Sequence, residues 1–320
     1  MDHARTGVGV AVKAIAQEAF GDVDVLALRD VPDPLVGPDQ VLVEIRTAGV
    51  NPVDGAVRAG YLQGQLPHHF PLVPGWDVAG VVVSVGPAVT RFAPGDEVFG
   101  YQRQDHVQFG TYAERIAATE RGLAHKPASL GFEEAGGLAL CGLTALQALR
   151  LVGVGEGDTV LVHAAAGGVG HLAVQIARLL GASRVVGTAS PRNHDFLRGL
   201  GAEPAAYGDA LVDNVAELVG GDGKVDVAFD CAGGAALGDS PALVRDPARI
   251  VSIVDTNAVG LGGRWAFARP VAEDLEWLAE RAGAGDLRVE VQQTFPLAQA
   301  VDAQRLLEGG HVRGKVVLTV

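Results

Sequence analysis

The spacing of apolar residues changes character along this chain of 320 residues. Up to about Lys126, short apolar runs alternate with turns containing proline or glycine, a pattern typical of a mostly β domain. These runs cover residues 25–28, 40–45, 78–85 and 96–99. From Gly131 to about Phe267, apolar strands, among them residues 225–230 and 249–254, alternate with helical segments and so predict a parallel sheet. Two helical stretches and a last strand follow, and residues 1–11 are expected to form a loose tail.

One stretch predicts a strand, a tight turn and a helix in immediate succession. The apolar run that ends at Val162 leads into Ala165-Ala166-Gly167-Gly168-Val169-Gly170 and then into an apolar-periodic helix. This order is typical of the first unit of a dinucleotide-binding fold, although a glycine-rich turn can also be ordinary loop punctuation. Gly167 would let the backbone approach a pyrophosphate, and Gly170 would let the helix pack on the strand. Residues Ala166 to Gly170, including Gly168 and Val169, are therefore candidate cofactor-binding residues, with the helix amides facing the phosphates.

The end of the second predicted strand favours NADPH over NADH. An NAD site uses a carboxylate about 20 residues past the glycines, but no Asp or Glu lies between Asp158 and His194. Ser190, Arg192 and Asn193 occur there instead. All three can bond a 2′-phosphate, and arginine can do so as a charged, bidentate donor. Ser190 and the proline after it could also simply begin a helix.

Several motifs resemble the quinone oxidoreductase (zeta-crystallin) branch of the medium-chain dehydrogenase/reductases. They are the glycine turn, Asn51-Pro52-Val53-Asp54, Pro74-Gly75-Trp76-Asp77 and Gly314-Lys315-Val316-Val317-Leu318. The resemblance implies an α/β architecture in which a GroES-like β-barrel catalytic domain comprises residues 1–127 and 268–320. It implies a Rossmann NADPH-binding domain, a doubly wound parallel sheet, in residues 128–267. It also implies a homodimer, paired through a strand near residues 264–267.

No metal site is expected. The zinc-dependent medium-chain dehydrogenases, which are relatives of the quinone oxidoreductase branch, use a catalytic cysteine and a Gly-His-Glu motif. At these positions the chain has Asn51 and Gly75-Trp76-Asp77. A structural lobe of four thiolates needs more than the two cysteines present. The nine histidines show no ligand spacing. Trp76 would either line the pocket or fill the core.

Without a Lewis acid, the favoured reaction is hydride transfer from NADPH to a quinone or an α,β-unsaturated carbonyl, with the cofactor carrying the chemistry. Asn51 is the first candidate catalytic residue, because its amide can donate to a developing oxyanion; its alternative is a turn residue before proline. Asp54 is a second candidate, although it lies four residues before Arg58 and could form a helical ion pair. Tyr61 occupies a position where the family places ligand-facing aromatics. A family tyrosine is replaced by Ala56, so no proton donor is assigned.

The remaining cofactor candidates lie far from the glycine turn in sequence. Cys231 and Ile253 are at the carboxyl ends of predicted parallel strands, where ligands bind. The resemblance adds Thr144, Tyr207, Phe267 and Lys315. Tyr207 could instead be a loop aromatic, and Lys315 an ordinary solvated charge. Cys141 is interpreted as a buried apolar residue.

Net charge, apolar run length and cysteine number limit the possible partners and the location of the protein. The formal net charge of −13 argues against a nucleic-acid or anionic-membrane partner. No apolar run reaches 18 residues, the N-terminus lacks an apolar signal core, and two distant cysteines fit a reducing cytosol, so a cytoplasmic location is expected. Two alternatives remain: an enoyl-thioester reductase of a biosynthetic pathway, or a non-catalytic NADPH-binding protein.

Overall fold

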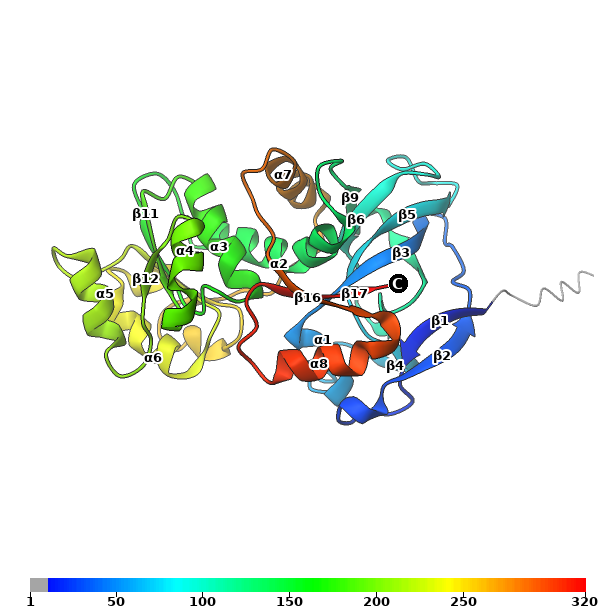
Figure 1. Ribbon diagram of the computed structural model, residues 1–320, viewed down its shortest axis with the longest axis horizontal. Coiled ribbons are helices and arrows are strands. Elements are labelled where there is room, and N and C mark those ends of the chain that lie inside the picture. The colour runs from blue at the N-terminus through cyan, green and yellow to red at the C-terminus, as the bar shows by residue number, and fades with distance from the viewer. Residues whose placement is uncertain (1–10) are drawn as a thin grey trace, which may run out of the picture.

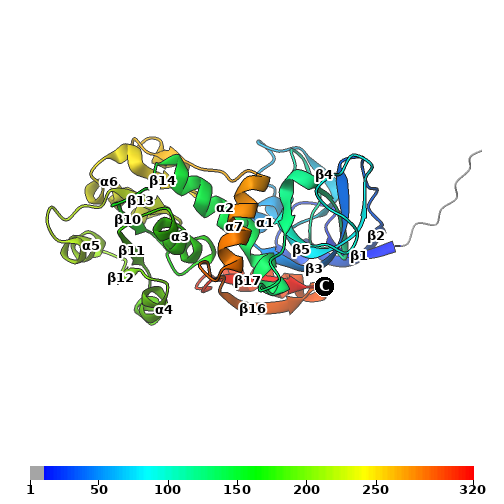
Figure 2. The same cartoon turned by 90° about the horizontal axis from the view of Figure 1, so that it is seen from above.

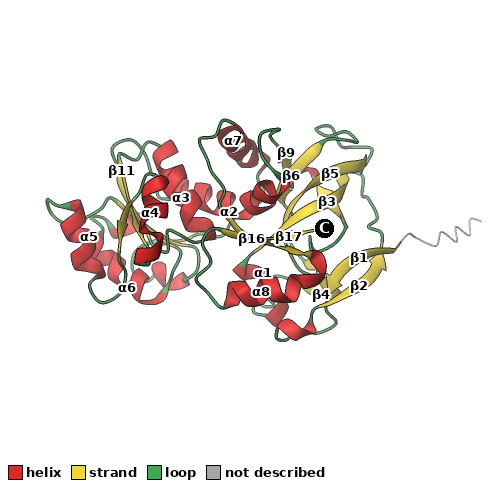
Figure 3. Ribbon diagram, viewed as in Figure 1, coloured by secondary structure: helices red, strands yellow, loops and turns green. Residues whose placement is uncertain are grey.

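The computed structural model describes residues 11–320 and consists of two lobes that lie side by side (Figure 1). One lobe contains strands between layers of helices, and the other is mostly strand (Figure 3). The expectation of a loose tail falls on residues 1–10, outside the described residues, and Ala11 already begins the first strand. No helix in the described part of the chain is long and apolar enough to cross a membrane.

The helix-covered lobe is built on a parallel sheet of six strands. Alternate residues of its strands face opposite layers. Val160 and Val162 pack towards α2 (Phe132–Leu151) and α3 (Gly168–Leu179), while Leu161 packs towards α5 (Leu211–Val219) and α6 (Gly234–Leu243). Burial on both faces explains the continuous apolar runs seen in the sequence. The strands, in spatial order, are β12 (Glu203–Ala205), β11 (Arg184–Thr188), β10 (Thr159–Val162), β13 (Val227–Asp230), β14 (Ile250–Ser252) and β15 (Arg264–Trp265).

The second lobe closes around a barrel-like sheet. Its core is formed by inward-facing residues such as Val43, Val98 and Leu123. The spatial order is β16 (Val291–Pro296), β17 (Lys315–Thr319), β3 (Gln40–Val50), β5 (Asp77–Val85), β6 (Glu97–Tyr101) and β9 (Leu123–His125), with β8 (Arg115–Thr119) paired to β3. Two small sheets join β1 (Ala11–Ala16) to β2 (Ala27–Pro32) and β4 (His68–Val73) to β7 (Val107–Phe109). The fold class is therefore a GroES-like barrel combined with a Rossmann sheet.

The helices are α1 (Pro52–Ala59), α2 (Phe132–Leu151), α3 (Gly168–Leu179), α4 (His194–Gly199), α5 (Leu211–Val219), α6 (Gly234–Leu243), α7 (Ala272–Gly283) and α8 (Ala300–Glu308). Helix α2 lies between the lobes, with α7 beside it (Figure 2). It packs against α3 on one side and against β3 and β5 on the other. That position explains why most of its residues are buried.

Several sequence-based boundaries were wrong. Residues 25–28 do not form one strand, because η1 (Val23–Val25) precedes β2, which begins at Ala27. The strands expected over residues 225–230 and 249–254 are shorter and form β13 and β14. Strand β16 was not predicted, since its residues, Val291-Gln292-Gln293-Thr294-Phe295-Pro296, are mostly exposed and lack an apolar run.

The glycine turn joins β10 to α3 through close backbone packing. A Cβ on Gly170 would lie 2.3 Å from the carbonyl oxygen of Ala164 and 2.7 Å from the Cα of Ala165. Real Cβ atoms do not approach backbone this closely, so only glycine lets the first turn of α3 rest against the end of β10. This is the packing that the sequence predicted for Gly170.

Candidate active site

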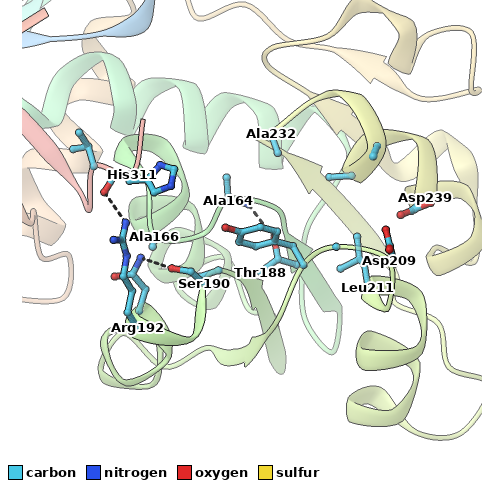
Figure 4. Close-up of a pocket in the computed structure, with 18 residues that line it drawn as sticks. Ala164, Ala166, Thr188, Ser190, Arg192, Asp209, Leu211, Ala232, Asp239 and His311 are labelled. Carbon is cyan, nitrogen blue, oxygen red and sulfur yellow. Dashed lines mark hydrogen bonds between the residues drawn. The ribbon is translucent and has the colours of Figure 1, made fainter. Parts of the chain in front are cut away.

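A cavity of about 710 Å³ opens at the carboxyl ends of β10 and β11 (Figure 4). Its wall combines the glycine turn, the segment after β11, the loop after β12 and the first turns of α6. The volume is in the range of small-molecule sites. Strand order reverses between β10 and β13, and the carboxyl ends of strands at such a point are the usual ligand position in open α/β sheets.

One end of this cavity is lined by hydrogen-bond donors. Ser190, Arg192 and Asn193 lie there, as the sequence predicted, and Tyr207 lines the same cavity. The Nη2 of Arg192 donates to the carbonyl oxygen of His311 at 3.3 Å, and Asn193 Nδ2 lies 3.5 Å from Ser190 Oγ (Figure 4). The structure thus brings together four residues spread over 18 positions of sequence.

The same cavity fits a dinucleotide at the glycine turn. Ala166 and Gly167 line it, and Gly167 is the N-cap residue directly before α3. The first amides of a helix have no acceptor within the helix and point out of its N-terminus. Together with the donors after β11, they make a site for a phosphate-rich ligand. Gly168, Val169 and Gly170 form the first turn of α3 but do not line the cavity itself.

A second group of candidate residues forms a buried polar cluster where the two lobes meet. The Nζ of Lys315 lies 2.5 Å from Asn51 Oδ1, 3.2 Å from the carbonyl oxygen of Val50 and 3.4 Å from Cys141 Sγ. The carboxylate of Asp77 is 3.7 Å away, and the Lys315 side chain is only 2% exposed. The interpretation of Lys315 as a solvated charge was therefore wrong.

Asn51 is held at both ends of its side chain. Its Oδ1 accepts from Lys315, and its Nδ2 donates to Asp77 Oδ2 at 2.9 Å. The other oxygen of Asp77 accepts from the backbone N–H of Leu140 in α2, at 2.6 Å. Cys141 is buried, as expected, but it also has polar neighbours. Its sulfur lies 3.6 Å from Asn51 Oδ1. The cluster therefore fixes the rotamer of Asn51.

Asp54 does not pair with Arg58, so the expected helical ion pair was wrong. Asp54 Oδ2 accepts from the backbone N–H of Asn51 at 2.8 Å and from the hydroxyl of Tyr112 at 2.9 Å. Arg58 points the other way and pairs with Glu308 at 2.8 Å. The reason is that Asp54 caps the start of α1, where free backbone amides compete for its carboxylate.

Burial governs the ionisation of these groups. Loss of water contact raises the pKa of Asp54 to about 7, against the hydrogen bonds from Asn51 and Tyr112 that lower it. Burial likewise raises the pKa of Asp77, opposed by the nearby Lys315 charge. Burial alone would lower the pKa of Lys315, yet the surrounding Cys141, Asp77 and Asp54 raise it, so the ammonium stays charged. Burial also raises the pKa of the Cys141 thiol, which is therefore protonated and a poor nucleophile.

Other candidate residues are placed apart from the cavity and the cluster. Tyr61 is 81% exposed beyond the end of α1 and touches neither. The Thr144 hydroxyl donates to the carbonyl oxygen of Leu140 within α2. Cys231 and Ile253 pack against the main core beside β13 and β14, and Phe267 lies under the guanidinium of Arg103. Their cofactor roles stay predictions. Trp76 is 5% exposed and packs edge-on against Tyr101, and it also lines a second cavity of about 440 Å³ in the barrel lobe.

Sequence reasoning missed several residues of these two sites. His311 and Val312 line the dinucleotide cavity although they lie more than 100 positions after the glycine turn, and Asp209 and Asp239 line its other end. Asp77 in β5, Tyr112 in the loop before β8 and Cys141 in α2 join the buried cluster. Asp77 stands in the motif that ends Gly75-Trp76-Asp77, but none of the three was assigned a role, because they meet only through tertiary contacts. Within residues 11–320, no three His, Cys, Asp or Glu side chains are grouped to hold a metal ion.

Family models match both parts of the chain. An alcohol dehydrogenase GroES-like domain matches residues 37–128, and a model described as zinc-binding dehydrogenase matches residues 200–318. These matches correspond to the barrel and to much of the Rossmann sheet with its return segment.

Relatives extend over nearly the whole chain. The chloroplast envelope quinone oxidoreductase homolog of Arabidopsis thaliana is 32% identical over 90% of this chain and 92% of its own length. The NADPH-dependent alkenal/one oxidoreductase of the same plant is 35% identical over 96% of this chain and 79% of its own length. A quinone oxidoreductase structure from Coxiella burnetii superposes with a TM-score of 0.85 at 35% identity, covering 97% of this chain and 99% of that one.

The chain belongs to the medium-chain dehydrogenase/reductase superfamily. Within that superfamily it is a member of the quinone oxidoreductase branch, as its sequence motifs predicted. It is an oxidoreductase that works with a nicotinamide cofactor.

We expect Asp54→Asn to flatten the pH dependence of stability. The pKa of Asp54 in the folded chain, about 7, lies above its unfolded value, so the folded state binds more protons between about pH 4 and pH 7. Its contribution to the free energy of unfolding therefore falls as pH rises through that window, by at most about 1.4 kcal/mol per pH unit. Asparagine keeps an acceptor for Tyr112 but does not titrate.

Urea unfolding of both proteins at several pH values checks this. Titrating groups remote from the cluster act equally in both, so the difference between the two curves reports Asp54 together with its coupling to Asp77 and Lys315. A parallel pair of curves would contradict the assignment.

Proposed function

We propose that this protein is an NADPH-dependent reductase that passes hydride to a quinone or an α,β-unsaturated carbonyl. The observation that carries the proposal is the donor-lined end of the dinucleotide cavity, where Ser190, Arg192 and Asn193 lie instead of a carboxylate. A 2′-phosphate suits that end, because arginine is a charged bidentate donor to phosphate. The bound nicotinamide would supply the hydride.

The chain's own residues would orient the reactants and exclude water. Gly167 and the amides of α3 would hold the pyrophosphate, and Asn51 would stand near the nicotinamide end in a rotamer fixed by Lys315 and Asp77. In this role Lys315 and Asp77 are positioning residues. A fixed neighbour of the reacting atoms lowers the entropy cost of reaching the transition state.

We also propose that turnover needs no metal. Asn51 stands where the zinc-dependent family members have a cysteine, and Trp76 where they have a histidine. The Asn51 carbonyl oxygen is already engaged by an ammonium. An acceptor that is itself electrophilic needs no Lewis acid, which agrees with quinones and enones as substrates.

The first test is steady-state oxidation of NADPH and, separately, NADH in the presence of EDTA. The acceptors are 1,4-benzoquinone, 9,10-phenanthrenequinone, an α,β-unsaturated ketone and an enoyl thioester. We expect turnover with NADPH on the quinones or the ketone and at least tenfold lower kcat/KM with NADH, because only NADPH offers the phosphate to Arg192. Turnover that EDTA abolishes and zinc restores would contradict the metal-free proposal. Turnover on the thioester alone would favour the biosynthetic alternative.

Replacing Arg192 by alanine should remove the preference for NADPH. Loss of one charge-assisted phosphate contact is expected to raise KM for NADPH by about 10- to 100-fold and to leave NADH within about twofold. Arg198→Ala is the matched control, because Arg198 lies on the neighbouring α4 and pairs with Asp195 at the surface. Equal losses for both nucleotides would reject the 2′-phosphate assignment.

The homodimer and the cytoplasmic location stay predictions. Strand β15 is the last strand of the six-stranded sheet, so a two-fold axis beside it would continue the sheet into a second copy. Sedimentation velocity should then give about twice the 32.9 kDa of one chain. Both plant relatives named above are described as chloroplast proteins, so location needs direct imaging of a tagged chain in its own cells.

A further inference from the structure

The return segment between α8 and β17 forms part of the dinucleotide cavity. His311 and Val312 belong to this segment, yet both line the cavity beside the residues that follow β11. Figure 4 shows His311 next to Arg192, with the two joined by a hydrogen bond. The donor-lined end of the cavity is thus built by both parts of the chain.

His311 is held in an uncommon backbone conformation. Its φ is +68°, in the left-handed region, where only glycine is free of steric cost and where histidine and asparagine occur more often than other side chains. Neighbouring contacts hold it there. Its carbonyl oxygen accepts from Arg192, the backbone N–H of Arg313 donates to Gln292 at 2.6 Å, and the N–H of Gly314 donates to Ala166 at 2.8 Å. The loop is therefore anchored at His311 itself and on its C-terminal side.

We propose that the imidazole of His311 is a further ligand for the 2′-phosphate and a determinant of NADPH selectivity. The inference rests on the proposed NADPH-dependent function and adds to it a residue from outside the Rossmann sheet. The cavity is polarised: Arg192 and His311 lie at one end, and Asp209 and Asp239 lie at the other (Figure 4). A dianionic group is drawn to the first end and repelled by the second.

A neutral imidazole donates one N–H and a protonated imidazole donates two, so His311 can bond a phosphate oxygen in either state. The charged groups nearest to it in the fold are Arg192 on η3 (Pro191–Asn193), which donates to its backbone carbonyl oxygen, and Arg313 on the same loop. Glu290 is paired with Arg313 at 3.0 Å and with Arg288 at 2.8 Å, so its charge is compensated.

The test compares binding of adenosine 2′,5′-bisphosphate with binding of adenosine 5′-monophosphate to the whole chain by calorimetry. The variants are His311→Gly, which keeps the left-handed turn and removes the imidazole, and Arg192→Ala as the reference for the phosphate site. His69→Gln, at an exposed position in the barrel lobe, is the histidine control.

For His311→Gly we expect about tenfold weaker binding of the bisphosphate, with the monophosphate unchanged. Unchanged bisphosphate binding by this variant, or equal losses for both ligands, would overturn the proposal. If Arg192→Ala then still weakens the bisphosphate alone, the NADPH proposal stands without His311. If the native chain binds both ligands equally, the proposed preference for NADPH is contradicted, and the proposed role of His311 is contradicted with it.

Discussion

The meeting of the two lobes depends on one buried ammonium group. Lys315 enters the protein on β17, a strand of the barrel sheet, and its charge is compensated by groups from β3, β5 and α2. A buried charge is costly unless it is paired and fully hydrogen-bonded. The ammonium is surrounded by the backbone carbonyl oxygen of Val50, the side-chain Oδ1 of Asn51, the Cys141 sulfur and the Asp77 carboxylate. Removing Asp77 would leave an uncompensated charge, and removing the other partners would leave its hydrogen bonds unmade, so these segments are held in one arrangement.

The same strand also connects that cluster to the dinucleotide cavity. The N–H of Gly314 donates to Ala166 in the glycine turn, and a Cβ on Gly168 would lie 3.3 Å from the Cδ of Lys315. The stem of Lys315 therefore passes the first turn of α3, while its head group holds Asn51. Val312 and His311, three and four residues before Lys315, line the cavity. The cavity lining and the buried cluster around Asn51 thus share a single covalent segment.

Those parts of the site whose residues are close together in the sequence could be predicted, and those whose residues are far apart could not. The strand, turn and helix around Gly167 and the donors after β11 occupy one continuous stretch, where period and residue type carry the information. The cluster around Lys315 is different, because Asn51, Asp77, Cys141 and Lys315 are spread over 264 positions and meet only after the chain has folded back. Asn51 and Lys315 were assigned roles through family motifs. Asp77 stands in such a motif, Pro74-Gly75-Trp76-Asp77, but received no role, and Cys141 was interpreted only as a buried apolar residue.

Errors in the sequence-based fold have equally physical causes. The pair Asp54 and Arg58 has the spacing of a helical ion pair, but a helix start offers unpaired amides, and these attract the carboxylate more strongly than a guanidinium one turn away. Strand β16 lacks an apolar run because it is an edge strand with one face open to water. In both cases the local sequence pattern does not show a second interaction that competes with the predicted one. The competitor was a backbone group in the first case and solvent in the second, and only the assembled chain shows which of the two prevails.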